Sequence, residues 1–242
     1  MQYLVGIPCL YGAEHTKESI ESVVHKENVD VLLINNGAED SVKKVINFYN
    51  KNKENVSIVN FPENIYVNPA WNYIIDFFLT IRDKYNYLCI MNSDIIMQKQ
   101  WNEVLNYLYK TTNYNDVLIP TQLQDKTLVD KDINIKDSRF QGVFSGTAGV
   151  CILLSRKQAE IIYPIPDYIK VWWGDYWIYN ILRKLGYNTF VVSNLLAYHW
   201  SGGSQTIQKI PGISALIEED KVQWELHGEI DIQKVVDRIQ NK

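Results

Sequence analysis

The fold is decided by Tyr87-Leu88-Cys89-Ile90-Met91-Asn92-Ser93-Asp94, an apolar run that ends abruptly in three polar residues. A short apolar run without alternation is typical of a strand buried on both faces of a sheet. Such a strand places Asp94 at the carboxyl edge of the sheet, where open α/β folds bind their ligands. A carboxylate there, with the amide of Asn92 two residues earlier, can hold a divalent metal that in turn holds phosphates.

Strand and helix patterns alternate through the first half of the chain. The other predicted strands of this half cover residues 3–9, 29–34 and 56–59. Apolar residues at helical spacing predict helices around residues 42–49, 71–79 and 101–108. Asn68 and Pro69 would start the second of these helices, as N-cap and first helical residue. This order predicts an α/β fold, with a mostly parallel central sheet flanked by helices.

The second half is less regular. Polar residues 122–139 predict a loop, and Gly186 predicts the end of a helix over residues 175–185. The remaining predicted elements are strands at 117–119, 148–154 and 189–192, a helix at 156–162, and a last helix that runs through Val222. Because no repeat or linker interrupts the chain, we expect a single domain over residues 1–242.

Composition narrows the classes of partner. The net charge of -4 gives no overall attraction to nucleic acids or anionic membranes. No apolar run approaches the ~20 residues of a membrane span, and no signal peptide precedes the first predicted strand. Cys9, Cys89 and Cys151 each lie in a predicted strand, as reduced core cysteines do. We therefore expect a cytoplasmic protein without a membrane span.

Polar residues also follow the other strands of the first half. Residues 8–12, 35–37 and Asn64 follow the first, second and third predicted strands. A single Asn after a strand usually serves a turn, but several at one edge of a parallel sheet mark a mononucleotide site. The chain carries neither G-x-G-x-x-G nor G-x-x-x-x-G-K-[ST], which argues against a dinucleotide fold and a P-loop.

Six short blocks follow one another along the chain, at residues 5–12, 33–38, 64–72, 92–94, 171–186 and 197–204. In this order they resemble the motifs of family 2 glycosyltransferases with the GT-A fold, close to the rhamnosyltransferase-like branch. The resemblance implies a nucleotide-sugar-binding half over about residues 1–110, an acceptor half over about 111–205, and a C-terminal helical extension over 206–242.

The resemblance also implies the donor site. Asp94 occupies the last position of the D-x-D motif and would bind Mn²⁺ or Mg²⁺, with His199 completing the metal site. The donor would be a UDP-, dTDP- or GDP-sugar, and Gly202 with Gly203 would let a lid close over it. The residues expected to bind the nucleotide sugar are Pro8, Tyr11, Asn35, Asn36, Gly37, Asn64, Asn72, Asn92 and Ser93.

Three positions depart from the family pattern. Asn35 stands where the family has an Asp that faces the nucleobase, and Asn92 replaces the first Asp of D-x-D. Tyr66 replaces a Gly and narrows its loop. Since hard cations prefer carboxylate oxygens, we expect weak metal binding until the diphosphate adds its own oxygens.

Asp175 matches the block that bears the catalytic base, and a carboxylate there can take the proton of the attacking acceptor hydroxyl. An N-cap role for Asp175 is the alternative. Trp172, Trp173 and Gly174 would contact the acceptor, because aromatic faces stack on sugars. The resemblance thus implies a metal-dependent inverting hexosyltransferase.

Two alternatives remain open at this stage. A nucleotidyltransferase shares a similar α/β core, although residues 8–12 lack the Lys and Arg that would hold a triphosphate. A non-catalytic sugar- or nucleotide-binding relative is the other, favoured by the amides Asn35 and Asn92. The expected acceptor is a glycan hydroxyl, with lipid-linked, protein and nucleic acid acceptors left open.

Overall fold

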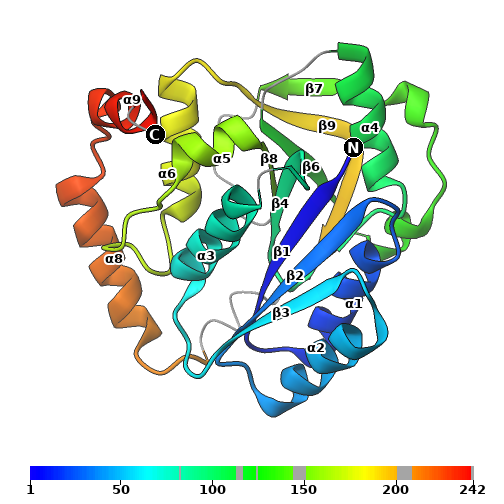
Figure 1. Ribbon diagram of the computed structural model, residues 1–242, viewed down its shortest axis with the longest axis horizontal. Helices are drawn as coiled ribbons and strands as arrows, with labels where there is room; N and C mark the ends of the chain where they lie inside the picture. The colour runs from blue at the N-terminus through cyan, green and yellow to red at the C-terminus, as the bar shows by residue number, and fades with distance from the viewer. Residues whose placement is uncertain (82, 113–116, 124, 144–150, 201–208, 241–242) are drawn as a thin grey trace.

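The computed structural model describes residues 1–81, 83–112, 117–123, 125–143, 151–200 and 209–240 (Figure 1). Within these residues a mixed sheet of nine strands has the order β3-β2-β1-β4-β8-β6-β9-β5, and β7 pairs with β9. The strands are β1 (Tyr3–Cys9), β2 (Val29–Asn36), β3 (Val56–Phe61), β4 (Tyr87–Met91), β5 (Ile95–Met97), β6 (Val117–Leu123), β7 (Phe140–Val143), β8 (Cys151–Ser155) and β9 (Thr189–His199).

The first half of the sheet is parallel, as predicted. β1 pairs in parallel with β2 and β4, and β2 pairs in parallel with β3. β8 then runs antiparallel to β4 and β6, while β5 and β7 run antiparallel to β9. The composition of an apolar run such as β8 does not indicate whether the strand runs parallel or antiparallel to its neighbours. The chain connections between the strands set that direction.

The two faces of the sheet are covered by different helices (Figure 1). One face packs against α1 (Ala13–Val24), α2 (Asp40–Asn52) and α4 (Trp101–Thr112). The other packs against α3 (Val67–Thr80), α5 (Arg156–Ile162) and α6 (Gly174–Lys184). The chain continues into α8 (Ile213–His227) and α9 (Ile232–Gln240), of which α9 buries Val235 in the second core.

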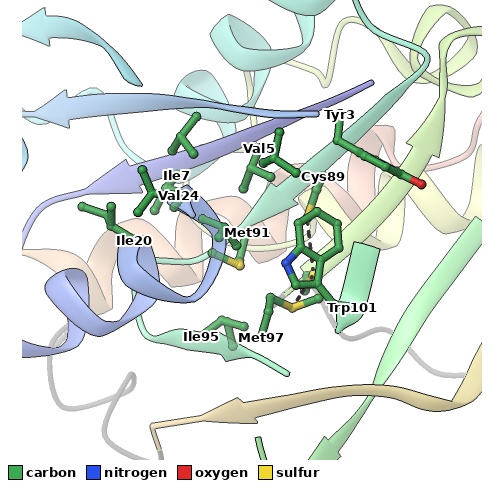
Figure 2. Close-up of a cluster of buried hydrophobic side chains, with 14 of the residues drawn as sticks. Tyr3, Val5, Ile7, Ile20, Val24, Cys89, Met91, Ile95, Met97 and Trp101 are labelled. Carbon is green, nitrogen blue, oxygen red and sulfur yellow. Dashed lines mark hydrogen bonds between the residues drawn. The ribbon is translucent and has the colours of Figure 1, made fainter. Parts of the chain in front are cut away.

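β1 supplies both cores through the alternation of its side chains. Tyr3, Val5 and Ile7 point to the face of α1 and α4, where Figure 2 shows them with Trp101. On the opposite face, a Cβ at Gly6 would lie 2.2 Å from Cγ2 of Ile74. The missing side chain therefore lets α3 pack directly on the strand that leads into the site.

Several boundaries differ from the predictions. α3 begins at Val67 with Tyr66 as its N-cap, so the prediction of Asn68 as N-cap is wrong. The segment predicted as a loop carries two short 3-10 helices, Lys126–Asp130 and Ile135–Asp137. Residues 148–150 of the predicted strand at 148–154 lie outside the described residues, and β8 starts at Cys151.

Gly186 follows α6 with φ 86, in keeping with its predicted place after the helix end. Cys9, Cys89 and Cys151 are buried in the core. Over the ranges that the structure describes, none of the helices combines the length and the apolar character needed to traverse a lipid bilayer.

Candidate active site

Asp94 and His199 meet at the carboxyl end of β4. The turn after β4 leads into β5, which pairs with β9 so that Ile95 lies opposite His199. This register brings Nε2 of His199 to 3.3 Å from Oδ2 of Asp94. The hydrogen bond that His199 makes to the Asp94 carboxylate raises the pKa of His199 above its ordinary value, against the opposing effect of partial burial.

The second carboxylate oxygen of Asp94 has no hydrogen-bond partner among the described residues. This oxygen, Oδ1, is buried, and a buried carboxylate oxygen ordinarily has a partner. A cation bound at Oδ1 and at the His199 imidazole would satisfy it, so the pair fits a divalent metal. Since a metal-bound imidazole must be neutral, binding at this pair should strengthen as the pH rises through the raised pKa of His199.

The protein alone supplies few ligands to such an ion. Within the described part of the chain, no cluster of three or more His, Cys, Asp or Glu side chains is placed to hold a metal. Two protein ligands leave most of the coordination sphere of Mn²⁺ or Mg²⁺ to other oxygens. Phosphate oxygens of a bound nucleotide would fill those positions.

Two residues of helix α1, Ser19 and Glu18, bond to the segments around Asp94. Ser19 Oγ donates to the carbonyl of Asn92 at 3.3 Å. The backbone N–H of Trp200 donates to the carbonyl of Asp94 at 3.0 Å, and its Nε1 donates to Glu18 at 3.0 Å. The Asn92 and Ser93 side chains are half-buried at the same turn. Gly202 and Gly203, the predicted lid, lie outside the described residues.

Asn35, at the end of β2, uses both ends of its amide. Nδ2 donates to Oδ1 of Asn60 at 2.8 Å, and Oδ1 accepts from the backbone N–H of Ala38 at 3.0 Å. An Asp at this position could not donate to Asn60. The amide is therefore matched to its neighbour on β3, and contact of Asn35 with a nucleobase stays a prediction.

Asn36 holds the loop that precedes α3. It accepts from the N–H of Ile65 at 2.8 Å and donates to the carbonyl of Tyr66 at 3.3 Å. Tyr66 has φ 69 and ψ 177, a conformation that is essentially confined to glycine and costs about 1–3 kcal/mol. The Tyr that replaces the family's Gly thus keeps a glycine conformation, which the bonds from Asn36 help to hold.

Gly37 is the point where the segments after β2 and β3 touch. Its φ is 65, and a Cβ there would lie 2.5 Å from the backbone N of Asn64. Asn64 is also fixed locally, since its Oδ1 accepts from the N–H of Tyr66 at 2.8 Å. Gly37 and Asn64 are therefore brought together, and contact of either with a nucleotide sugar stays a prediction.

Gly37→Ala should lower the free energy of unfolding by more than Gly186→Ala does. Both glycines have positive φ, but nothing lies within 4 Å of a Cβ at Gly186. The left-handed conformation alone costs an alanine about 1–2 kcal/mol, and the clash at Asn64 should add about 1–3 kcal/mol. Chemical denaturation of the two variants measures the difference. Equal destabilisation would contradict the close contact between Gly37 and Asn64.

The loop after β1 is tied to the start of α2. The N–H of Gly12 donates to Oε1 of Glu39 at 3.1 Å, and the N–H of Glu39 donates to the carbonyl of Leu10 at 3.0 Å. Pro8, near the end of β1, and Tyr11, in this loop, are both half-buried. The role of Glu39 in this loop was not predicted, because Glu39 lies outside the blocks that match the family.

Asn72 and Asn68 face the segment between α5 and α6. Asn72 makes a two-way pair with Ile165, with an Nδ2–O distance of 2.8 Å and an N–Oδ1 distance of 2.7 Å. Asn68 donates to the carbonyls of Ile169 at 3.2 Å and Trp172 at 2.9 Å. Both side chains therefore bond α3 to the connection between α5 and α6, which lies in the predicted acceptor half. Donor binding by Asn72 stays a prediction.

Asp175 lies in the first turn of α6, which begins at Gly174 with Trp173 as its N-cap. The N-cap alternative for Asp175 is therefore wrong, and its Oδ1 accepts from the N–H of Tyr176 at 2.9 Å. Burial, and then the charge of Asp175, raise the pKa of Tyr179 well above its ordinary value. Tyr179 thus stays protonated, and the role of Asp175 as a base stays a prediction.

The predicted acceptor residues surround this helix start. A Cβ at Gly174 would lie 2.1 Å from Oδ1 of Asn68, so the glycine permits close contact with α3. The Trp172 side chain is 51% exposed. Trp173 stacks on Trp224 of α8, with ring centroids 5.7 Å apart and an interplanar angle of 8°. The sequence pattern gave no signal for Trp224.

A model described as "Glycosyl transferase family 2" matches residues 4–147. No curated protein matches the sequence.

Several solved structures share the fold. S. aureus TarS 1-349 superposes with a TM-score of 0.62 at 12% identity, over 99% of this chain and 69% of that chain. Mannosyltransferase PcManGT from Pyrobaculum calidifontis, in complex with GDP-Man and Mn²⁺, gives a TM-score of 0.60 at 10% identity, over 99% and 73%. GalNAc-T7 with UDP, GalNAc and Mn²⁺ gives 0.60 at 11% identity, over 99% and 54%. At these identities the likeness is one of fold, and it confirms the predicted GT-A fold.

Proposed function

The chain belongs to glycosyl transferase family 2, and from this premise we propose that it transfers a sugar from a nucleoside diphosphate sugar to an acceptor hydroxyl with inversion. The observation that carries the proposal is the Asp94–His199 pair, with its unpartnered buried oxygen at the carboxyl end of β4. The family match favours glycosyl transfer over the nucleotidyltransferase and the non-catalytic binding protein that the sequence analysis left open.

In this proposal the donor lies across the ends of β1, β2 and β4. Asp94 and His199 would hold Mn²⁺ or Mg²⁺, supported by Asn92. When bound, the metal would neutralise the charge that develops on the leaving diphosphate. The side chains proposed to line the nucleotide sugar are Pro8, Tyr11, Asn35, Asn36, Gly37, Asn64, Asn72, Asn92 and Ser93.

The acceptor approaches from the side of α6. Asp175 would take the proton of the attacking hydroxyl, and Trp172, Trp173 and Gly174 would contact the acceptor. A single displacement needs one such base opposite the leaving group, which gives inversion at the anomeric carbon. The exposed ring of Trp172 supports a glycan as the acceptor, because an apolar aromatic face matches the apolar face of a sugar ring. We propose that the donor half covers about residues 1–110 and the acceptor half about residues 111–205. The C-terminal extension at 206–242 flanks them.

Release of free nucleoside diphosphate tests the function directly. UDP-, dTDP- and GDP-sugars are incubated with the protein in the presence of Mn²⁺, Mg²⁺ or EDTA, and the nucleotide product is measured. We expect release from one class of donor with Mn²⁺ or Mg²⁺ and its loss with EDTA, because the two protein ligands need a shared cation to bind a diphosphate. Release that EDTA leaves unchanged would contradict the metal site, and the absence of release from every donor would contradict the function.

A further inference from the structure

Asp220 of α8 is a buried carboxylate that binds the backbone of residues 170–172. These residues lie before α6 in the predicted acceptor half and are called the acceptor segment below. The Asp220 side chain is 1% exposed. Oδ1 accepts from the N–H of Lys170 at 2.9 Å, and Oδ2 accepts from the N–H of Val171 at 2.6 Å and of Trp172 at 2.9 Å. Three charge-assisted hydrogen bonds to consecutive residues leave this segment little freedom to rotate.

The same segment is also bonded to α3. The backbone N–H of Asn68 donates to the carbonyl of Lys170 at 2.9 Å, and its side chain donates to Ile169 and Trp172. Figure 1 shows the connection between α5 and α6 running beside α8. Asn68 thus donates to the carbonyls of Ile169, Lys170 and Trp172. Asp220 accepts from the N–H groups of Lys170, Val171 and Trp172.

We propose that Asp220 is a positioning residue for the acceptor side of the active site. It fixes the backbone of Trp172, and the next residues are Trp173, the N-cap of α6, and Gly174, which precedes Asp175. Trp224, one helical turn after Asp220, stacks on Trp173 and adds a second contact from α8. The proposal rests on the proposed function, because it assigns these residues to the acceptor.

The Asp94–His199 pair is held by elements other than α8 and the segment before α6, and this separates the two effects. Asp94 and His199 are set by β4, β5 and β9, with further bonds from α1. Loss of Asp220 should therefore change the use of the acceptor while metal and nucleotide still bind. A shift of about 1 Å in a reacting group can lower the rate of transfer about 10²-fold.

Two substitutions of Asp220 remove these hydrogen bonds to different extents. Asp220→Asn keeps one oxygen, which can still accept from Val171 and Trp172, but its amide would face the N–H of Lys170. Asp220→Ala removes all three bonds. Glu219→Gln is the matched control, since Glu219 is the exposed neighbour of Asp220 on the same helix. If Asp220→Ala does not fold, Asp220→Asn carries the test.

Hydrogen exchange and kinetics are measured on the full chain. We expect the amides of residues 170–172 to lose protection in Asp220→Asn, more so in Asp220→Ala, and to keep it in Glu219→Gln. With a p-nitrophenyl glycoside as acceptor, kcat/KM for the acceptor should fall about 10- to 100-fold in Asp220→Asn. The Kd for UDP with Mn²⁺ should stay at the wild-type value.

Unchanged protection at 170–172, unchanged acceptor kcat/KM, or an equal loss of UDP affinity would each overturn the positioning role. Failure of the proposed function has a different signature, since the wild-type protein would then release no nucleoside diphosphate from any donor. In that case the exchange of residues 170–172 and of the first turn of α6 decides whether Asp220 holds this segment.

Discussion

Replacing Asp94 with alanine is expected to abolish sugar transfer and to weaken the binding of nucleoside diphosphate in the presence of Mn²⁺. Asp94 is the one acidic residue of the Asn-Ser-Asp turn, and its buried Oδ1 has no partner among the described residues. Loss of one preorganised electrostatic contact commonly lowers kcat about 10²–10³-fold. Here we expect at least that loss, because His199 alone would be left to hold the cation. Nucleotide release and calorimetric titration of UDP with Mn²⁺ measure the two effects.

Asp94→Asn and His199→Ala serve as graded controls for this result. The amide keeps the shape of the carboxylate without its charge, so Asp94→Asn should lose nearly as much metal-stimulated activity as Asp94→Ala. His199→Ala keeps the carboxylate and should lose less. Full Mn²⁺-stimulated release by Asp94→Ala would show that the cation, if one binds, lies elsewhere.

The parallel part of the sheet could be predicted because its strands carry their own signal. β1, β2 and β4 are buried on both faces, so each is a short run of mostly apolar residues. β3, at the edge of the sheet, is only partly buried, and its signal is the shorter apolar run around Ile58 and Val59. α1 was missed for the opposite reason. Its buried face includes Thr16 and Ser19, which interrupt the apolar spacing on which the prediction of a helix depends.

The juxtaposition of Asp94 and His199 was predictable to the extent that the family motif places them at matching blocks. The supports of the acceptor segment were not. Asn68 reads as an N-cap from the local sequence, yet its side chain bonds to residues about a hundred positions away. Asp220 lies fifty residues after Lys170, in a helix without clear periodicity, and its role exists only through the tertiary fold.

Asp175→Ala is expected to lower kcat for transfer about 10²–10⁴-fold, the usual contribution of a general base. The affinity for UDP with Mn²⁺ should be unchanged, because Asp94 and His199 remain. This separation of chemistry from donor binding distinguishes a base from a metal ligand. Single-turnover transfer to a defined acceptor, together with titration of UDP, provides both measurements.

Asp40→Asn is the matched control for this substitution. Asp40 also lies in the first turn of a helix, α2, but its side chain is 91% exposed and its helix is remote from α6 in the chain. Both changes remove a carboxylate that interacts favourably with the N-terminal end of a helix, worth about 0.3–1 kcal/mol. A loss of transfer in Asp175→Ala that Asp40→Asn does not share therefore reports the base itself. Wild-type transfer by Asp175→Ala with a defined acceptor would remove Asp175 from the mechanism.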